Sequence, residues 1–150
     1  MNEFIDYLLH FGNLNKQQID FISKKGNEQQ LRKGDYFVEA GKIIKQAGFL
    51  IEGIIRVCYY NHKGDEITRY FVDENHLILD PRNFEGNVPI SEYLQAVTDC
   101  RLVVFSKEDW EEISNTAIGW DAIVRKIISK NHIEKLERRS PLVSQDAETR

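Results

Sequence analysis

Few side chains in this sequence have the types and spacing that binding chemistry requires, and most candidates lie between His76 and Tyr93. His76, Arg82 and Ser91 could form hydrogen bonds with a ligand, and Tyr93 could pack on a flat one. From residue 83 to residue 100 there is no lysine or arginine, although the chain has 20 basic residues in 150. A buried phosphate needs a cationic partner, so a pocket built on this stretch would suit an anion poorly.

The other reactive residues do not form a catalytic or metal site. The four histidines are far apart, and none has a second histidine at metal-binding spacing. Cys58 and Cys100 lie in apolar runs, which predicts buried free thiols in a reducing cytoplasm. No nucleophile-elbow, phosphate-loop or Cys–His motif occurs. We therefore predict no catalytic residues, no metal, no cofactor and no enzymatic activity.

Length and composition indicate one soluble domain. The chain has 150 residues, of which 41% are hydrophobic and 29% charged, with a formal net charge of -4. This charge gives no general attraction to nucleic acid or to acidic membranes. No apolar run approaches the roughly 20 residues needed to span a bilayer, and the N-terminal residues lack a signal-peptide pattern. We expect a cytoplasmic protein without a membrane partner.

The segment from residue 28 to residue 105 predicts a β-rich body. Its apolar runs are short and separated by glycines, which is typical of antiparallel strands that close into a small barrel or sandwich. The clearest element is a hairpin. Residues 49–60 are predicted as one strand in which Gly53 marks a bulge or a bend, and residues 66–72 return after a turn to which Gly64 supplies a positive φ.

Short helices are predicted on both sides of this body. The first covers residues 3–11, and Asn13 or Asn15 can cap a second. After the strands, Ser106 and Asp109 have the spacing of a helix start, and the helix is expected to end at Ile113.

The longest predicted helix runs from about Thr116 to Leu136 or Arg138. Its apolar residues follow the i, i+3, i+4, i+7, i+8 pattern of a helix with one buried face. These residues are Trp120, Ile123, Val124, Ile127 and Ile128. Pro141 is predicted to end the helix, and the fragment from Ser144 resembles the first turn of another.

The order of strands and glycines resembles the ligand-sensing half of the Crp/Fnr family of bacterial transcription regulators. The segment that carries the likeness is LRKGDYFVEAGKIIKQAGFLIEGIIRVCYYNHKGDEITRYF, residues 31–71. The shared features are Lys33-Gly34-Asp35, Gly41, Gly53, Arg56-Val57 and Gly64, in this order. The resemblance covers about residues 1–138. It implies a mainly β fold, a double-stranded β-helix or cupin-like jelly roll of the cyclic-nucleotide-binding type, with short N-terminal helices and a long C-terminal helix.

The same resemblance implies the domain organisation. Residues 1–114 would form the cyclic-nucleotide-binding-like body, and residues 115–139 would form the helix through which the family dimerises. Residues 140–150 lie where a helix-turn-helix domain would begin, so DNA binding is expected only through a domain that this chain lacks. We expect a homodimer formed through the five apolar residues of the long helix. A helix packed wholly on its own body is the alternative.

Family members that bind cyclic nucleotides use a Gly-Glu-Leu turn followed by an arginine and then a serine or threonine. The resemblance places Ile90 at the arginine position and Ser91 at the serine position. His76 or Asn75 stands nearest to the glutamate position. Because isoleucine cannot pair with a phosphate, we do not expect cyclic AMP to bind in the standard way.

Other residues near this end of the body leave the ligand open. Arg82 could enter the pocket from the preceding loop, and a surface position is the alternative. Glu92 would repel a phosphate if it pointed inward. Tyr93, Phe71 and Phe84 would suit a flat apolar ligand, or they fill the core. The resemblance thus implies a pocket for a neutral or weakly polar effector, or an empty one.

The sequence therefore predicts the effector-sensing and dimerisation domain of a Crp/Fnr-type regulator with an unknown small-molecule effector. Ligand would favour one arrangement of the loop at residues 80–91, expected to be mobile, against the long helix. The alternative is a ligand-free scaffold for protein interaction and dimerisation, in which Ile90 and Tyr93 fill the pocket. A cupin-like enzyme is the third interpretation.

Overall fold

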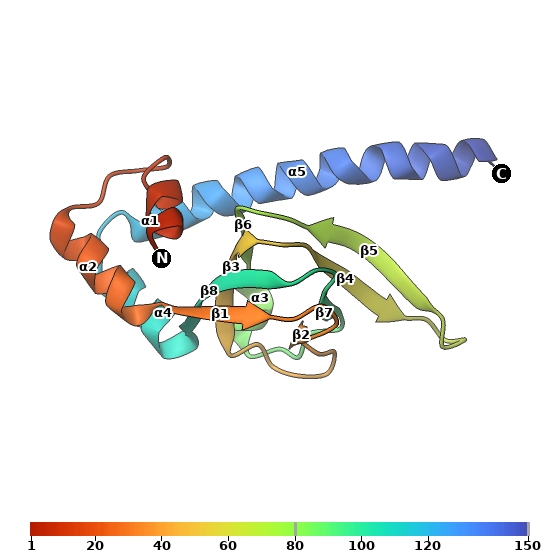
Figure 1. Cartoon of the computed structure of the whole chain (residues 1–150), viewed down its shortest axis with the longest axis horizontal. Helices are drawn as coiled ribbons and strands as arrows, with labels where there is room; N and C mark the ends of the chain where they lie inside the picture. Colours follow the sequence, from red (N-terminus) through yellow and green to blue (C-terminus); the bar gives the residue numbers. More distant parts are fainter. Residues whose placement is uncertain (80, 150) are drawn as a thin grey trace.

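The structure is a computed structural model of the chain. It describes the backbone of residues 1–79 and 81–149 and the side chains of residues 1–79 and 84–134. Two four-stranded sheets form the body, and the long helix α5 (Trp120–Thr149) extends along one side of it (Figure 1). The other helices are α1 (Asn2–Leu8), α2 (Lys16–Lys25), α3 (Pro81–Gly86) and α4 (Lys107–Thr116).

Both sheets are antiparallel. The strand order of the first is β1 (Asn27–Leu31), β8 (Cys100–Ser106), β3 (Gln46–Glu52) and β6 (His76–Ile78). The order of the second is β2 (Tyr36–Val38), β7 (Tyr93–Ala96), β4 (Ile55–Tyr60) and β5 (Glu66–Val72). This confirms the mainly β class with flanking helices. The expected closed barrel is wrong, because the described strands pair only within their own sheet and leave β1, β6, β2 and β5 as edges.

Gly53 is the corner at which the chain leaves one sheet for the other. The predicted single strand over residues 49–60 is divided here into β3 and β4, so the bend is the correct alternative. Gly53 has φ +108°, and a Cβ at this position would lie 2.6 Å from the Asp99 carbonyl oxygen. Glycine is therefore required both by the backbone conformation and by the close approach of β8.

The β4–β5 hairpin forms as predicted. Asn61 organises its turn, because its Oδ1 accepts hydrogen bonds from the backbone N–H groups of Lys63 and Asp65, both at 2.9 Å. Gly64 has φ +82°, the conformation expected of it. The hairpin matters for the site because β5 carries residues that face α5.

Local capping signals in the sequence locate two helix starts correctly. Asn15 caps α2 and forms a reciprocal capping box with Gln18, with both hydrogen bonds at 2.8 Å. Ser106 caps α4 and accepts from the Asp109 N–H at 3.1 Å. The lengths were predicted less well, since α1 ends at Leu8 and not at residue 11, and α4 continues to Thr116.

The bounds of α5 differ from those predicted. It begins at Trp120 and not at Thr116, because Gly119, with φ +95°, turns the chain between α4 and α5. It continues past Pro141 to Thr149, where a helix end and a new start at Ser144 were expected. A proline removes one helical hydrogen bond, but its φ is compatible with a helix. The side chains of residues 135–150 lie outside the described part.

The segment predicted as a loop at residues 80–91 contains the short helix α3. Pro81 stands at its first position, where the missing N–H of proline breaks no helical hydrogen bond. The side chain of Arg82 is outside the described residues, so its predicted ligand role stays a prediction.

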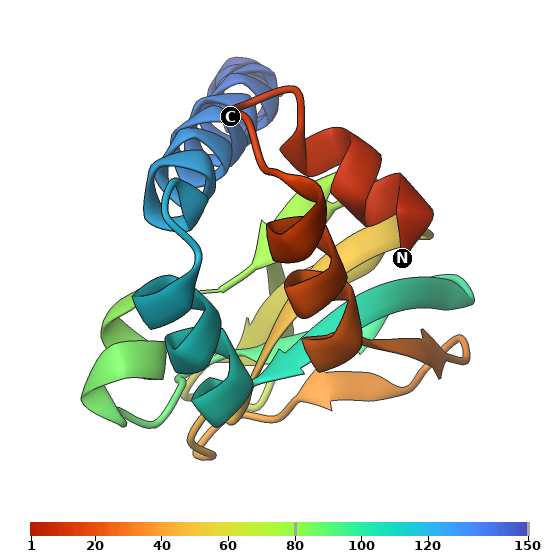
Figure 2. The same ribbon diagram turned by 90° about the vertical axis from the view of Figure 1, so that its left-hand side faces the viewer.

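The core is an aromatic cluster to which five elements contribute one ring each. The rings are Phe4 of α1, Phe49 of β3, Phe105 of β8, Trp110 of α4 and Trp120 of α5. The Trp110 and Trp120 centroids are 5.1 Å apart, and those of Phe4 and Phe49 are 4.9 Å apart. Figure 2 shows α2 beside α4 and the start of α5 above them. The cluster thus fixes the first turns of α5 to the body.

Both cysteines are free and buried, as predicted. Burial raises the pKa of the Cys58 thiol and that of the Cys100 thiol. Among the described residues, no helix has the length and apolar character required to cross a membrane.

Candidate functional site

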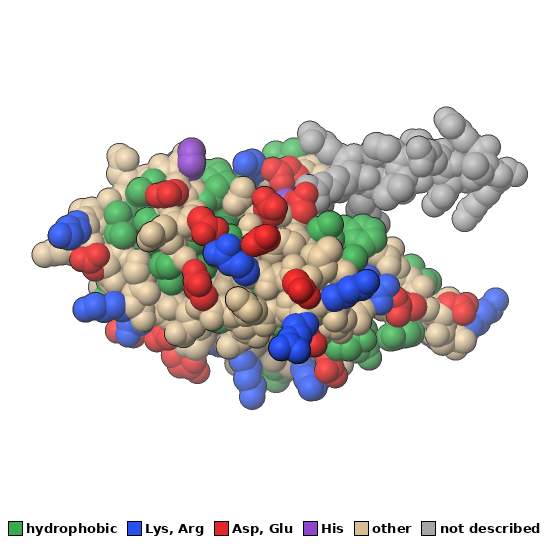
Figure 3. Space-filling model, in the orientation of Figure 1, with side chains coloured by type: hydrophobic (Ala, Val, Ile, Leu, Met, Phe, Trp, Pro, Cys, Tyr) green, Lys and Arg blue, Asp and Glu red, His purple; other side chains and the backbone are tan. Residues whose placement is uncertain are grey.

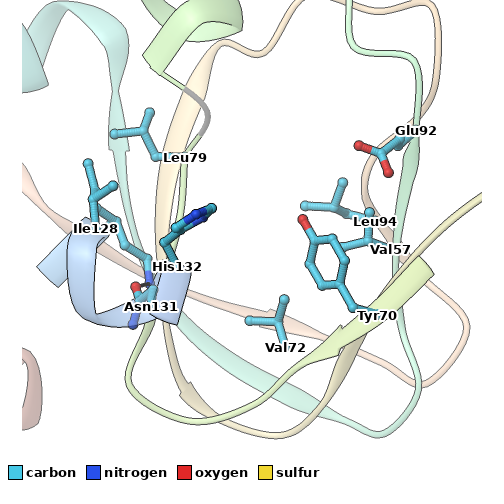
Figure 4. Close-up of a pocket in the computed structure, with 10 residues that line it drawn as sticks. Val57, Tyr70, Val72, Leu79, Glu92, Leu94, Ile128, Asn131 and His132 are labelled. Carbon is cyan, nitrogen blue, oxygen red and sulfur yellow. Dashed lines mark hydrogen bonds between the residues drawn. The ribbon is translucent and has the colours of Figure 1, made fainter. Parts of the chain in front are cut away.

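A cavity of 230 Å³ lies between the second sheet and α5 (Figure 4). Residues of the strands and their connections supply one part of its lining, and α5 supplies the other. The lining residues in the described part of the chain are Val57, Tyr70, Val72, Leu77, Leu79, Glu92, Leu94, Ile128, Asn131 and His132. Because both the body and the helix line it, a molecule in the cavity would contact both.

Strand register places three of these residues in one row. Val57 of β4 pairs with Tyr70 of β5 on one side and with Leu94 of β7 on the other. Directly paired residues of antiparallel strands project to the same face, so the three side chains form a continuous wall. Figure 4 shows this wall opposite Ile128 and His132.

Glu92 adds a negative charge to this wall. It precedes β7, and its carboxylate Oε2 lies 2.9 Å from Nε of Arg69. That oxygen is nevertheless buried and accepts no hydrogen bond, so the contact with Arg69 is an ion pair without hydrogen-bond alignment. Arg69 also packs on the Tyr59 ring, 4.6 Å from its centroid.

The helix side of the cavity is fixed by Asn131, which is 5% exposed. Its Oδ1 accepts from the Leu77 N–H at 3.0 Å, and its Nδ2 donates to the Asn75 carbonyl at 3.4 Å. These hydrogen bonds join α5 to β6 next to the cavity. His132, the following residue, is exposed and extends its ring into the cavity (Figure 4).

His76, predicted as a ligand contact, does not line the cavity. It is 2% exposed, and its Nε2 lies 2.9 Å from the Glu134 carboxylate of α5. Its Nδ1 is 3.1 Å from each of the Asp73 and Glu74 carbonyl oxygens. His76 therefore lies between the turn before β6 and the long helix.

Lys130 strengthens the same attachment of α5. Its ammonium lies 3.8 Å from Glu134 and donates to the Tyr7 hydroxyl at 3.3 Å. The hydrogen bond to Tyr7 raises the pKa of Lys130. One helical turn earlier, Lys126 donates to the Phe11 carbonyl at 3.0 Å.

The other predicted ligand residues are also placed away from the cavity. Ile90 is 8% exposed and lies in the core, with its backbone paired to Gly41 and Lys42. Ser91 is exposed and outside the lining. Tyr93 packs against Tyr36 and Tyr60, with centroids 5.6 Å and 5.4 Å apart.

The two further aromatic candidates are not in the lining either. Phe84 is buried, 6.1 Å from the Trp110 ring, and Phe71 is 46% exposed. Phe84 lies outside the lining because it belongs to α3 and packs toward α4. Phe71 lies outside because its side chain is on the opposite face of β5 from those of Tyr70 and Val72, which line the cavity.

The residues predicted for the dimer helix are mostly used inside the chain. Trp120, Ile123 and Ile127 are 0%, 2% and 1% exposed within this one chain. These three side chains are therefore not available to a partner in this arrangement, and the sequence pattern reflects packing of α5 on its own body. Val124 and Ile128 are half-buried and line a groove between α3, α4 and α5.

Sequence reasoning missed the residues that form the polar part of the lining. The sequence interpretation gives no role to Tyr70, Asn131 or His132, and it expects Glu92 only to repel a phosphate. A signal for Asn131 existed, since it continues the apolar series through Ile127 along the helix. A polar residue at such a core position needs a buried partner.

The charge and composition of the site limit its chemistry. Among the residues whose side chains the structure describes, no lysine or arginine lines the cavity. In the described part of the chain, no three His, Cys, Asp or Glu side chains are grouped as a metal site would require. The described lining combines apolar side chains with the polar groups of Tyr70, Glu92, Asn131 and His132.

Comparison with known proteins is consistent with this architecture. No curated protein sequence matches the chain. Among solved structures, the c-di-GMP responsive global regulator CLP of Xanthomonas campestris is similar, with a TM-score of 0.71, 14% identity, and coverage of 89% of this chain and 65% of that one. The Thermus thermophilus catabolite activator protein has a TM-score of 0.66, 15% identity and coverage of 92% and 63%.

A third similar structure is the sensor domain of the transcriptional regulator DNR from Pseudomonas aeruginosa, with a TM-score of 0.63, 17% identity and coverage of 89% of this chain and 86% of that domain. The chain spans about 63% of the length of the Thermus protein. The family model of the cyclic nucleotide-binding domain matches residues 28–117. The chain belongs to the cyclic nucleotide-binding domain family.

Proposed function

We propose that this chain is the effector-sensing domain of a Crp/Fnr-type bacterial transcription regulator of the cytoplasm, and that the effector occupies the cavity between the second sheet and α5. The observation that carries the proposal is the shared lining, to which Val57, Tyr70 and Leu94 contribute from the strands and Ile128 and His132 from the helix. A ligand held by both parts changes the free energy of docking α5 on the body.

The mechanism is a population shift of α5. Hydrogen bonds of Asn131 hold the helix beside β6, next to the cavity. A ligand that fits only one position of α5 favours that position. In a full-length regulator the helix would pass this change to a DNA-binding domain, for which residues 140–150 would be the start.

The proposed effector is not a cyclic nucleotide bound in the standard way. Ile90 is in the core, and Glu92 brings a carboxylate to a lining that has no lysine or arginine among its described residues. A desolvated cyclic phosphate would thus meet repulsion where it needs pairing. The side chain of Arg82 remains the one candidate cation from the sequence prediction.

Thermal unfolding with millimolar cyclic AMP or cyclic GMP tests this part of the proposal. We expect no change of the unfolding midpoint, whereas a ligand at about 100 times its Kd would raise it by roughly 5–10 °C. The Arg82→Ala variant is the control. An increase in the wild type that this variant loses would show that Arg82 pairs with the phosphate, and would contradict the proposed ligand class.

A second experiment tests the cavity itself. Leu94→Phe adds volume to the sheet wall, and a matched Ile118→Phe variant changes a side chain that is 88% exposed. We expect 2-phenylethanol to stabilise the wild type and Ile118→Phe but not Leu94→Phe. Equal stabilisation of all three would place the binding elsewhere and contradict the proposed site.

The alternative function is a ligand-free scaffold. It is favoured by one observation, namely that Ile90 fills core space. Dimerisation is part of both proposals. Because Trp120, Ile123 and Ile127 are buried, a dimer would have to use the remaining surface of α5, including Ile133, which is 56% exposed.

A further inference from the structure

We propose that the ligand of this cavity is a small amine with an apolar body, and that its ammonium group binds at Glu92. This inference rests on the proposed function of the cavity as an effector site. It adds the chemical class and the orientation of the ligand.

One oxygen of the Glu92 carboxylate lacks a hydrogen-bond donor. This Oε2 atom is buried and accepts no hydrogen bond, although Nε of Arg69 lies 2.9 Å away. The side chains of Arg69 and Glu92 are 45% and 23% exposed, so water screens their attraction. A buried carboxylate oxygen without a hydrogen bond is unfavourable, and an ammonium group, with three donors, can supply what Arg69 does not.

The described lining carries a negative charge, whose counter-ion Arg69 stands outside it. Among the lining residues that the structure describes, Glu92 is the only carboxylate and none is a lysine or an arginine. Such a site attracts a cation and repels an anion. The Tyr70 ring belongs to the same wall as Glu92 in Figure 4 and can contribute a cation–π contact.

The α5 side of the cavity has an apolar part. There Ile128 lies beside the polar Asn131 and His132, across the cavity from Leu94 and Val57 of the sheet (Figure 4). An apolar ligand body is favoured there by its removal from water. With the ammonium at Glu92 and the body toward α5, one small molecule contacts both sides.

Three probes with the same phenylethyl body test the charge class: 2-phenylethylamine, 2-phenylethanol and 3-phenylpropanoate. We expect calorimetric titration of the chain at pH 7 to show the amine binding about tenfold more tightly than the alcohol, as a hydrogen-bonded charge pair would give. The carboxylate is expected to bind most weakly.

Variants locate the ammonium. Glu92→Gln should lower the affinity for the amine to that for the alcohol and leave alcohol binding unchanged. Arg69→Gln removes the competing cation and should increase amine affinity, which a variant that merely destabilised the fold would not do. Glu108→Gln makes the same charge change at an exposed site outside the cavity and should have no effect.

The possible outcomes separate the two proposals. If the alcohol or the carboxylate binds as tightly as the amine, and Leu94→Phe abolishes this binding, the effector cavity stands and the amine class is wrong. Amine binding that Glu92→Gln does not weaken also overturns the inference. If none of the three probes binds, both the amine class and the proposed effector site are contradicted.

Discussion

Gly53 shows how one residue determines the path of the chain. Its positive φ and the contact with β8 allow the corner between the two sheets. We predict that Gly53→Ala lowers the free energy of unfolding by about 2–4 kcal/mol, because strain and a clash at 2.6 Å add. Urea unfolding of the variant and of the wild type measures this loss.

Gly64 is the matched control, since it has φ +82° but no atom within 4 Å of an added Cβ. Its alanine variant should lose only about 1 kcal/mol. Equal losses for the two variants would contradict the packing argument at Gly53.

The cysteines give a second prediction at this scale. Burial raises the pKa of both thiols, so less thiolate exists in the folded than in the unfolded chain at any pH near the ordinary thiol pKa. The free energy of unfolding is therefore not reduced by the thiols at a pH below their pKa in the unfolded chain. It falls as the pH rises from there through their raised pKa in the folded chain. At pH 8 we expect a disulfide reagent to label Cys58 and Cys100 only after unfolding in urea. Rapid labelling of the native chain would contradict their burial.

At the scale of elements, the attachment of α5 to β6 depends on Asn131. Replacing it with alanine leaves the Leu77 N–H without its acceptor in a buried place. We predict a loss of about 1–3 kcal/mol in the free energy of unfolding. Asn115→Ala, at an exposed position of α4, is the control and should change it by less than about 0.5 kcal/mol. Similar small effects for both variants would mean that Asn131 does not hold the helix.

Elements were predictable from the sequence where a local interaction defines them. Asn15 and Ser106 mark helix starts within a few residues, and Gly64 marks a turn, because the partners are neighbours in the chain. The division into two sheets and the lining of the cavity depend on strands far apart in sequence. Tyr70 faces the cavity because of its register with Val57, and no local pattern records that register.

The site was predicted less well for the same reason. The family resemblance located Ile90 at a position where an anion partner would be needed, but the polar lining comes from β5 and α5. The apolar series on α5 predicts a dimer surface, and the structure shows that Trp120, Ile123 and Ile127 of this series are buried within the chain. Amphipathic spacing shows that one face is covered, but it does not show by what.

At the scale of the whole molecule, the surface and α5 bear on assembly. Acidic and basic side chains are interspersed over the face shown in Figure 3, as the net charge of -4 would suggest. If α5 forms a dimer, we expect Ile133→Glu to convert it to a monomer in light-scattering measurements. Ile118→Glu, also at an exposed isoleucine, should leave it intact. Dissociation by both variants, or by neither, would contradict a dimer that depends on Ile133.

The central claim is that the cavity controls the docking of α5, and hydrogen exchange tests it without a ligand. The Leu94→Phe variant is compared with the wild type and with Ile118→Phe. We predict that Leu94→Phe alone alters the protection of the α5 amides at residues 124–134 from exchange, and that protection in α2 is unchanged. Unchanged exchange in α5, or an equal change in α2 and α5, would contradict the coupling of cavity and helix.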